Sequence, residues 1–194
     1  MNIVLIGFMA SGKTSVGRRV AKRLGYRFMD TDQLIESEQG RAIADIFAAE
    51  GEPHFRGLET HLLARLRRCD NHVFSTGGGI ITTPGNLELL KRIGVVVFLK
   101  ADLEDILRRL EHDKRRPKVQ GGDLRTKVTT LLGERLPLYE QADVVIETLG
   151  KTPNLVAGEV IRRATGFRRD PAPAPEEAAG PASTPEDAAG GGVS

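Results

Sequence analysis

The stretch Gly7-Phe8-Met9-Ala10-Ser11-Gly12-Lys13-Thr14 decides which fold this chain can have. It fits the pattern G-x-x-x-x-G-K-[ST], whose glycines let a loop curl until successive backbone N–H groups point at one anion. The apolar run 2–6 precedes it, as expected of a strand buried on both faces, and the amphipathic run 15–24 follows it. Strand, loop and helix together predict a phosphate-binding loop rather than a chance glycine turn.

Outward from this loop, short apolar runs alternate with longer amphipathic ones. Strands are expected over 2–6, 26–29, 71–75, 95–99 and 143–148, and helices over 15–24, 31–39, 41–50, 59–68, 84–93, 102–111, 123–141 and 154–164. This rhythm predicts a single α/β domain, a five-stranded parallel sheet flanked by helices. Pro84 suits the first turn of its helix, and the polar, basic segment 112–122 is expected to be a mobile lid loop.

Composition excludes several classes of protein. Hydrophobic residues make up 40% of the 194 and charged residues 28%, the balance of a soluble globular protein. No apolar run approaches the roughly 18 residues that a membrane span needs. The N-terminus lacks a basic region and a cleavage site, so secretion is not expected. The single cysteine, Cys69, excludes an internal disulfide and a structural zinc site, and it fits a reducing cytoplasm.

The charge is divided unevenly along the chain. Residues 170–194 include 5 Pro, 7 Ala, 4 Gly and 5 acids but no Lys or Arg, so we expect a disordered tail over 169–194 after a domain over 1–168. The rest of the chain carries 28 basic and 21 acidic side chains. These basic residues are spread along the sequence and aromatics are few, which favours small anionic ligands over nucleic acid or a membrane.

The phosphate-binding loop predicts a nucleotide site built largely from backbone. Lys13 would reach the β- and γ-phosphates and the Thr14 hydroxyl would bind Mg²⁺. Motors, switches and kinases all share this loop. The chain has no N-K-x-D motif for a guanine base and is short for a motor, so a small-molecule kinase is favoured. The expected ATP-binding residues of the loop are Ala10, Ser11, Gly12, Lys13, Thr14 and Ser15.

Three other groups of residues point to an acceptor site. Asp30-Thr31-Asp32 follows the second strand, where open α/β sheets place ligands, although a helix N-cap is the alternative role. Arg56 and Glu59 lie one helical turn apart, and two roles are open to them. They form either a surface ion pair or a site in which Glu59 holds Arg56 so that it binds a substrate carboxylate. The consecutive glycines Gly77, Gly78 and Gly79 cost conformational entropy, so close approach of the backbone to a ligand explains them better than a plain loop.

With these motifs in place, the chain resembles the shikimate kinases, of the nucleoside-monophosphate-kinase-like group of P-loop folds. The resemblance covers about residues 2–165 and also includes Ile43-Ala44-Asp45-Ile46-Phe47, Gly51-Glu52, Arg116-Pro117 and Arg135-x-Pro137-Leu138-Tyr139. It implies transfer of the ATP γ-phosphoryl group to the 3-hydroxyl of shikimate, a step of chorismate and aromatic amino-acid biosynthesis. It also implies a cytoplasmic monomer with ATP as co-substrate and Mg²⁺ as cofactor.

The same resemblance implies roles for the acceptor residues. Asp32 would bind the ring hydroxyls of shikimate and accept the proton. Arg56 and Arg135 would hold the carboxylate. Within the loop Gly77–Gly79, Gly78 would supply a backbone N–H.

Roles on the nucleotide side are also implied. Asp30 would hold Mg²⁺ through water beside Thr14. Arg109 would pack over adenine, and Lys151 would line its other side. Arg116, on the lid, would join Lys13 in neutralising charge on the transferring phosphate.

The chain departs from the family pattern at Ala10, where glycine is usual, at Lys118, where an apolar residue is usual, and at Lys151, where arginine is common. Two alternatives remain at this stage, another small-molecule kinase such as gluconate kinase and a non-catalytic nucleotide-binding protein. Arg56, Arg135 and the three glycines favour a rigid cyclic carboxylate over an open-chain sugar acid. A non-catalytic protein would be expected to have lost Lys13, Asp32 or Arg116.

Overall fold

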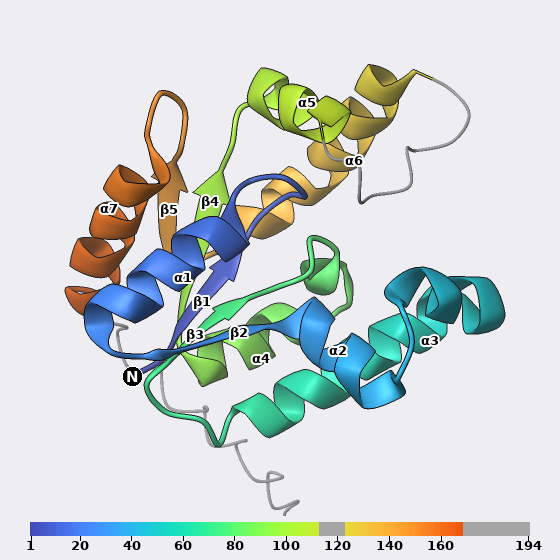
Figure 1. Cartoon of the computed structure of the whole chain (residues 1–194), viewed down its shortest axis with the longest axis horizontal. Helices are drawn as coiled ribbons and strands as arrows, with labels where there is room; N and C mark the ends of the chain where they lie inside the picture. The colour runs from blue at the N-terminus through green and yellow to red at the C-terminus, as the bar shows by residue number, and fades with distance from the viewer. Residues whose placement is uncertain (113–122, 169–194) are drawn as a thin grey trace, which may run out of the picture.

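The computed structural model describes residues 1–112 and 123–168 (Figure 1). Its five strands are all parallel and are arranged in the order β2-β3-β1-β4-β5. This confirms the expected α/β architecture. The lid beyond residue 112 and the tail 169–194 lie outside the described residues. The strands are β1 Ile3–Ile6, β2 Arg27–Asp30, β3 His72–Ser75, β4 Val95–Lys100 and β5 Val144–Glu147.

Helices connect the strands in the order that the periodicity predicted. A short 3-10 helix, η1 (Ile80–Thr82), adds a turn that was not expected after the glycines. The described helices are α1 Lys13–Leu24, α2 Thr31–Gln39, α3 Ile43–Leu66, α4 Asn86–Ile93, α5 Leu103–His112, α6 Leu124–Tyr139 and α7 Pro153–Thr165.

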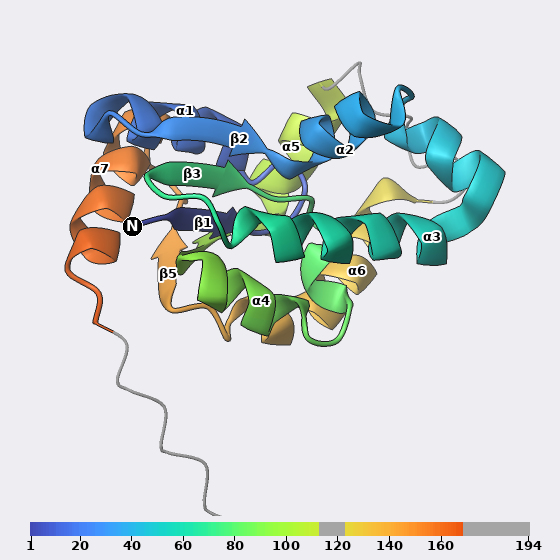
Figure 2. The same cartoon turned by 90° about the horizontal axis from the view of Figure 1, so that it is seen from below.

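Each face of the sheet has its own hydrophobic core, because successive side chains of a strand point to opposite faces. Ile3 and Leu5 of β1 belong to a cluster with residues of α1 and α7. Val4 and Ile6 belong to a second cluster, with residues of α3, α4 and α6. Figure 2 shows α1 on one side of the sheet and α4 and α6 on the other. Burial on both faces explains why β1 is apolar throughout rather than alternating.

The carboxyl ends of the strands lie at one edge of the sheet and carry the predicted motifs. β1 leads into the phosphate-binding loop (residues 7–14), β2 into α2, and β3 into the glycine loop (Gly77–Gly79). In Figure 1, α2 and α3 lie to one side of this edge and α5 and α6 to the other. Strand order therefore brings motifs that are distant in sequence to the edge where parallel sheets bind ligands.

Two predicted boundaries were wrong. The helix expected over 41–50 does end at a break, since Gly51 adopts the non-helical φ 80°, ψ 173° and kinks α3, but the helix expected over 59–68 begins directly after this kink. The helix resumes directly after the kink because Pro53 falls in its first turn, where a missing N–H costs nothing. Helix α4 begins at Asn86 and not at Pro84, since Gly85, with φ 84°, is its non-helical N-cap.

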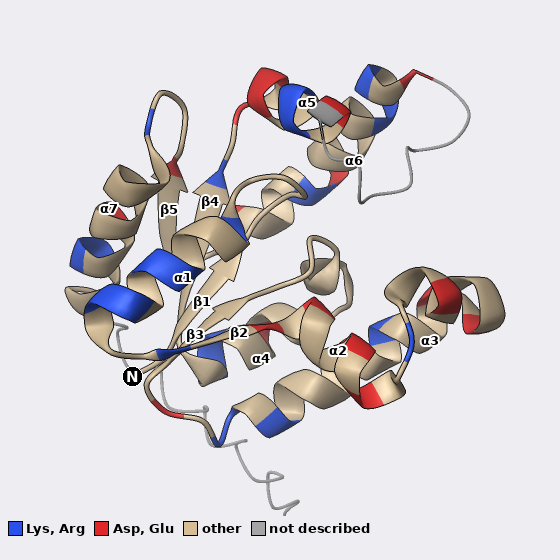
Figure 3. Cartoon of the chain, viewed as in Figure 1, with Lys and Arg blue, Asp and Glu red and all other residues tan. Residues whose placement is uncertain are grey.

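The charged residues are distributed over several elements. In the view of Figure 3, Lys and Arg lie on α1, α3, α5, α6 and α7.

Among the helices of residues 1–112 and 123–168, none combines the length and the apolar character needed to cross a membrane.

Candidate active site

The phosphate-binding loop has the backbone conformation that its glycines predicted. Gly7 and Gly12 adopt φ 146° and 93°, which side chains rarely tolerate. A Cβ atom at Gly7 would also lie only 2.8 Å from the carbonyl oxygen of Leu99. The Lys13 Nζ atom lies inside the curl and donates hydrogen bonds of 2.8 Å to the carbonyl oxygens of Gly7 and Phe8. The loop thus holds its cation beside the backbone that would surround a phosphate.

Ala10 adopts the left-handed conformation, with φ 59°. This conformation is open to glycine but costs other residues roughly 1–2 kcal/mol. Ala10 therefore holds a strained conformation that glycine, the usual residue of the family at this position, adopts without this cost. The Ala10 carbonyl oxygen accepts a 3.0 Å hydrogen bond from Arg109 Nη1, which ties α5 to the loop.

Oxygen atoms suited to a magnesium ion meet beside Thr14. The Thr14 hydroxyl donates to Asp30 Oδ2 at 3.0 Å and lies 3.3 Å from the Ser75 hydroxyl. Asp30 is also the N-cap of α2, because its Oδ1 accepts from the Asp32 N–H at 3.2 Å. No group of three or more His, Cys, Asp or Glu side chains suited to a metal occurs among the described residues. Mg²⁺ commonly takes only one or two protein oxygens beside water and substrate phosphates, so this donor set fits it.

The glycine loop is where the predicted acceptor residues and the phosphate-binding loop meet. A Cβ atom at Gly77 would lie 2.6 Å from Asp32 Oδ1 and 3.0 Å from Glu59 Oε1, and one at Gly79 would overlap the Arg56 guanidinium. At Gly78 it would lie 3.2 Å from the Met9 amide nitrogen. We expected these glycines to make room for a ligand. In the structure, the protein's own side chains and backbone occupy that space.

The pair formed by Arg56 and Glu59 is not a surface ion pair. Arg56 Nη1 donates to Glu59 Oε2 at 2.7 Å, and the Glu59 side chain is completely buried. Burial raises the pKa of Glu59 to about 6, and the Arg56 guanidinium opposes this shift. The opposite edge of the guanidinium, Nε and Nη2, donates to Glu52 Oε1 at 3.0 and 2.6 Å. Glu59 therefore holds the inner edge of the Arg56 guanidinium, and the outer edge can bind a carboxylate.

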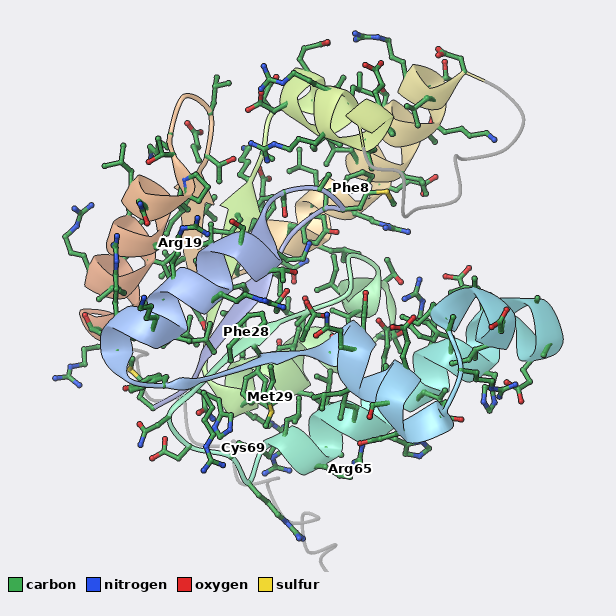
Figure 4. The ribbon with its side chains drawn as sticks, viewed as in Figure 1. Phe8, Arg19, Phe28, Met29, Arg65 and Cys69 are labelled. Atoms are coloured by element: carbon green, nitrogen blue, oxygen red, sulfur yellow. The ribbon has the colours of Figure 1, made fainter. Side chains whose placement is uncertain are left out.

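Helix α6 supplies the second predicted arginine. The Arg135 guanidinium lies 5.8 Å from the centre of the Phe8 ring, and Figure 4 labels Phe8 where the phosphate-binding loop approaches α6. One turn later, the buried Tyr139 hydroxyl donates to the Gly78 carbonyl oxygen, and the Tyr139 ring stacks on Phe98 at 4.9 Å. Burial raises the pKa of Tyr139 to about 12, so the phenol keeps its proton. Arg135 and the glycine loop are thereby joined through α6.

The structure brings the residues predicted for an acceptor site, Asp32, Arg56, Gly77–Gly79 and Arg135, to one place, next to the phosphate-binding loop. Lys151 forms an ion pair of 2.8 Å with Glu159 of α7. Arg116 and Lys118 lie outside the described residues.

Three contacts were missed by the sequence analysis, those of Ser75, Thr31 and Tyr139. Ser75 could have been found as the polar residue that ends an apolar strand at the ligand-binding edge. Thr31 and Tyr139 stand inside quoted motifs, but no local pattern reveals a hydroxyl that binds the backbone of a distant loop.

Comparison with known proteins gives one consistent result. The family model described as "Shikimate kinase" matches residues 9–165. A shikimate kinase of Caldanaerobacter subterraneus subsp. tengcongensis is 45% identical over 161 residues, which cover 83% of this chain and 94% of the relative. The solved shikimate kinase of Acinetobacter baumannii in complex with shikimate has a TM-score of 0.78 and 41% identity, covering 83% of this chain and 90% of that one.

The fold is also shared with a kinase that has another acceptor. A gluconokinase of Sinorhizobium meliloti has a TM-score of 0.53 and 18% identity, over 83% of this chain and 89% of that one. At that identity, the likeness concerns the fold alone.

Proposed function

The chain belongs to the shikimate kinase family and is an ATP-dependent kinase that acts on shikimate, and we propose that the residues described above divide this work between two adjoining subsites. The reaction transfers the γ-phosphoryl group of ATP to the 3-hydroxyl of shikimate and yields shikimate 3-phosphate and ADP. One observation supports this division into two adjoining subsites. The glycine loop of the acceptor side packs against the phosphate-binding loop, since a Cβ at Gly78 would lie 3.2 Å from the Met9 amide nitrogen.

The acceptor subsite recognises a carboxylate on a rigid ring. Arg56 would bind the carboxylate with its Nε and Nη2 edge, replacing Glu52, and Arg135 would approach from the opposite helix. Asp32, beside Gly77, would accept a hydrogen bond from the 3-hydroxyl and take its proton during transfer. The Gly78 N–H would hold a further oxygen of the acceptor.

The phosphate subsite stabilises negative charge. Lys13 would exchange its bonds to the Gly7 and Phe8 carbonyl oxygens for bonds to the β- and γ-phosphates. Thr14 would hold Mg²⁺ directly and Asp30 through water, while Ser75 orients the Thr14 hydroxyl. The ion neutralises charge on the phosphate oxygens when it is bound.

Three basic residues complete the nucleotide side of the proposal. Arg109 would turn from the Ala10 carbonyl oxygen to cover adenine, and Lys151 would line the other side of the base. Arg116 would approach the transferring phosphate from the lid. We further propose a cytoplasmic monomer whose partners are shikimate and ATP, with neither nucleic acid nor a membrane.

The test is ADP release by the purified chain with Mg-ATP and either shikimate, gluconate or no acceptor. Release that depends on shikimate is expected. Release with gluconate alone, or none with any acceptor from folded protein that binds ATP, would contradict the proposal.

The carboxylate assignment has a matched pair of variants on one helix. Arg56→Lys should raise the KM for shikimate about tenfold or more, because an ammonium cannot make the planar two-bond contact. Arg65→Lys, at an exposed arginine of α3 that pairs with Glu38, should leave the KM unchanged. Equal behaviour of the two variants would remove Arg56 from the acceptor subsite.

A further inference from the structure

Two buried hydroxyl groups hold the glycine loop, one on each side of its central peptide. The Gly77 N–H donates to Thr31 Oγ1 at 3.2 Å, and the Gly78 carbonyl oxygen accepts from the Tyr139 hydroxyl at 2.5 Å. The side chains of Thr31 and Tyr139 are both fully buried. They come from α2 and α6, on opposite sides of the loop.

The two anchors leave one peptide unit between them, the one that joins the Gly77 carbonyl to the Gly78 N–H. Its carbonyl oxygen accepts from the Ile80 N–H at 3.3 Å. Its N–H has no acceptor among the residues that the structure describes. Because each peptide is planar, fixing the units on either side leaves this unit only a rotation about the line between its two Cα atoms. The bond from the Ile80 N–H to the Gly77 carbonyl oxygen sets that rotation, and with it the direction of the Gly78 N–H.

We propose that Thr31 and Tyr139 are positioning residues for the acceptor, which together orient the Gly78 N–H that binds it. Three consecutive glycines sample far more backbone conformations than other residues, so an unanchored loop would present this N–H in many directions. A donor that is already oriented binds its partner without paying that ordering entropy at the moment of binding. The inference rests on the proposed function, because it assigns the Gly78 N–H to the acceptor of the kinase reaction.

Each anchor also sets the loop against a side chain of the acceptor subsite. Thr31 precedes Asp32, whose carboxylate fills the space beside Gly77. Tyr139 follows Arg135 by one turn of α6, and its ring is held by stacking on Phe98. The hydroxyls thereby fix the spacing between the donor N–H, the carboxylate and the guanidinium.

Removal of each hydroxyl with retention of shape tests the proposal. In Tyr139→Phe and Thr31→Val, the KM for shikimate should rise about tenfold, the equivalent of one hydrogen bond of roughly 1.4 kcal/mol. The KM for ATP should stay within about twofold of that of the parent chain. Thr31→Ser, which keeps the hydroxyl, should restore the parent KM for shikimate.

Thr76→Val is the control for a purely structural effect. Its hydroxyl is also buried and lies one residue before the loop, but it donates to the Leu5 carbonyl oxygen of β1 at 3.1 Å. This variant should have a lower Tm and an unchanged KM for shikimate. The Tm of every variant is measured beside its kinetics, so that misfolding is recognised. If Thr31→Val does not fold, Thr31→Ala, which also removes the hydroxyl, replaces it as the test at residue 31.

The outcomes separate the inference from the proposed function. If the parent chain shows no turnover that depends on shikimate, the proposed function fails and the inference fails with it. If the parent chain is active and folded Tyr139→Phe and Thr31→Val keep its KM for shikimate, the inference alone is overturned. A uniform rise of both KM values, matched by Thr76→Val, would also overturn it by showing a general loss of structure.

Discussion

Arg56 and Glu59 form an ion pair of 2.7 Å in which the carboxylate is completely buried and the arginine side chain keeps 16% of its surface exposed. The guanidinium is therefore held from its buried side. Glu59 fixes the inner edge of the guanidinium, and the outer edge reaches Glu52, which is 59% exposed and held only by a surface contact. A buried carboxylate thus aims a cation at the place where an anionic acceptor would enter.

This geometry makes stability depend on pH through Glu59. Burial raises its pKa from 4.5 to about 6, so the folded chain holds the proton more tightly than the unfolded chain. The resulting stabilisation is complete below about pH 4.5 and is lost as the pH rises through about 6. The Tm of Glu59→Gln minus the Tm of the parent chain should therefore increase as the pH rises from 4.5 to 7, as measured by thermal denaturation.

The control for this pH effect is Glu50→Gln. Glu50 is exposed and its pKa is lowered by a hydrogen bond from Arg41, so no gain by the variant is expected over the same range. A difference in Tm between parent and Glu59→Gln that does not change with pH would refute the assignment.

Gly79→Ala should impair acceptor binding without unfolding the chain. The added methyl group would overlap the Arg56 guanidinium, which is the end of a flexible side chain and can move aside. We expect the KM for shikimate to rise about tenfold, because a displaced guanidinium loses its two-bond contact, while the Tm changes little. Gly133→Ala, with open space around it on α6, is the matched control and should keep the parent KM. An unchanged KM in Gly79→Ala would show that Arg56 need not lie against the loop.

Ala10→Gly should raise stability. Alanine at φ 59° carries a strain of roughly 1–2 kcal/mol, from which the greater backbone entropy of glycine subtracts about 0.5–1 kcal/mol. A gain of about 1 kcal/mol corresponds to roughly 2–4 °C in Tm for a chain of this size. Asn71→Gly is the comparison, since Asn71 has φ 57° but asparagine tolerates that region, and its gain should be smaller. A lower Tm for Ala10→Gly would contradict the assignment of strain.

Asp32→Asn should lower kcat at least about a hundredfold, because an amide cannot take the proton of the acceptor hydroxyl. Nucleotide affinity, measured by calorimetry with a non-hydrolysable ATP analogue, should change little, since we assign Asp32 to the acceptor subsite. Asp45→Asn, at an exposed carboxylate of α3, serves as the control. Near-parental turnover by Asp32→Asn would remove this residue from the proton transfer.

Deletion of residues 170–194 should change neither the Tm nor the rate of ADP release. Every buried hydrophobic residue of the two described cores lies between Ile3 and Ala164. Calorimetry and the coupled ADP assay on the truncated chain check this expectation. A clear loss of either property would show that the tail contributes to the folded enzyme.

The sequence by itself determined the elements of this protein and the chemistry that they carry. Apolar runs of strand length, helical periodicity and the glycines of residues 7–14 are local signals, which act over one turn or one strand. They predicted the parallel sheet, the phosphate-binding loop and the separation of one turn between Arg56 and Glu59. They misplaced the start of α4, because the backbone conformation of Gly85 is not encoded in a hydrophobic pattern, and they missed the helical residues 52–58 that follow the kink at Gly51.

Only the tertiary structure decided how these pieces meet. Strand β3 lies between β2 and β1, so the glycine loop reaches Asp32 on one side and the phosphate-binding loop on the other. The complete burial of Glu59 and the bonds from Thr31 and Tyr139 to the loop follow from that placement. The reason is physical: burial and hydrogen bonds between distant segments depend on which strands are neighbours, and no short window of residues specifies strand order.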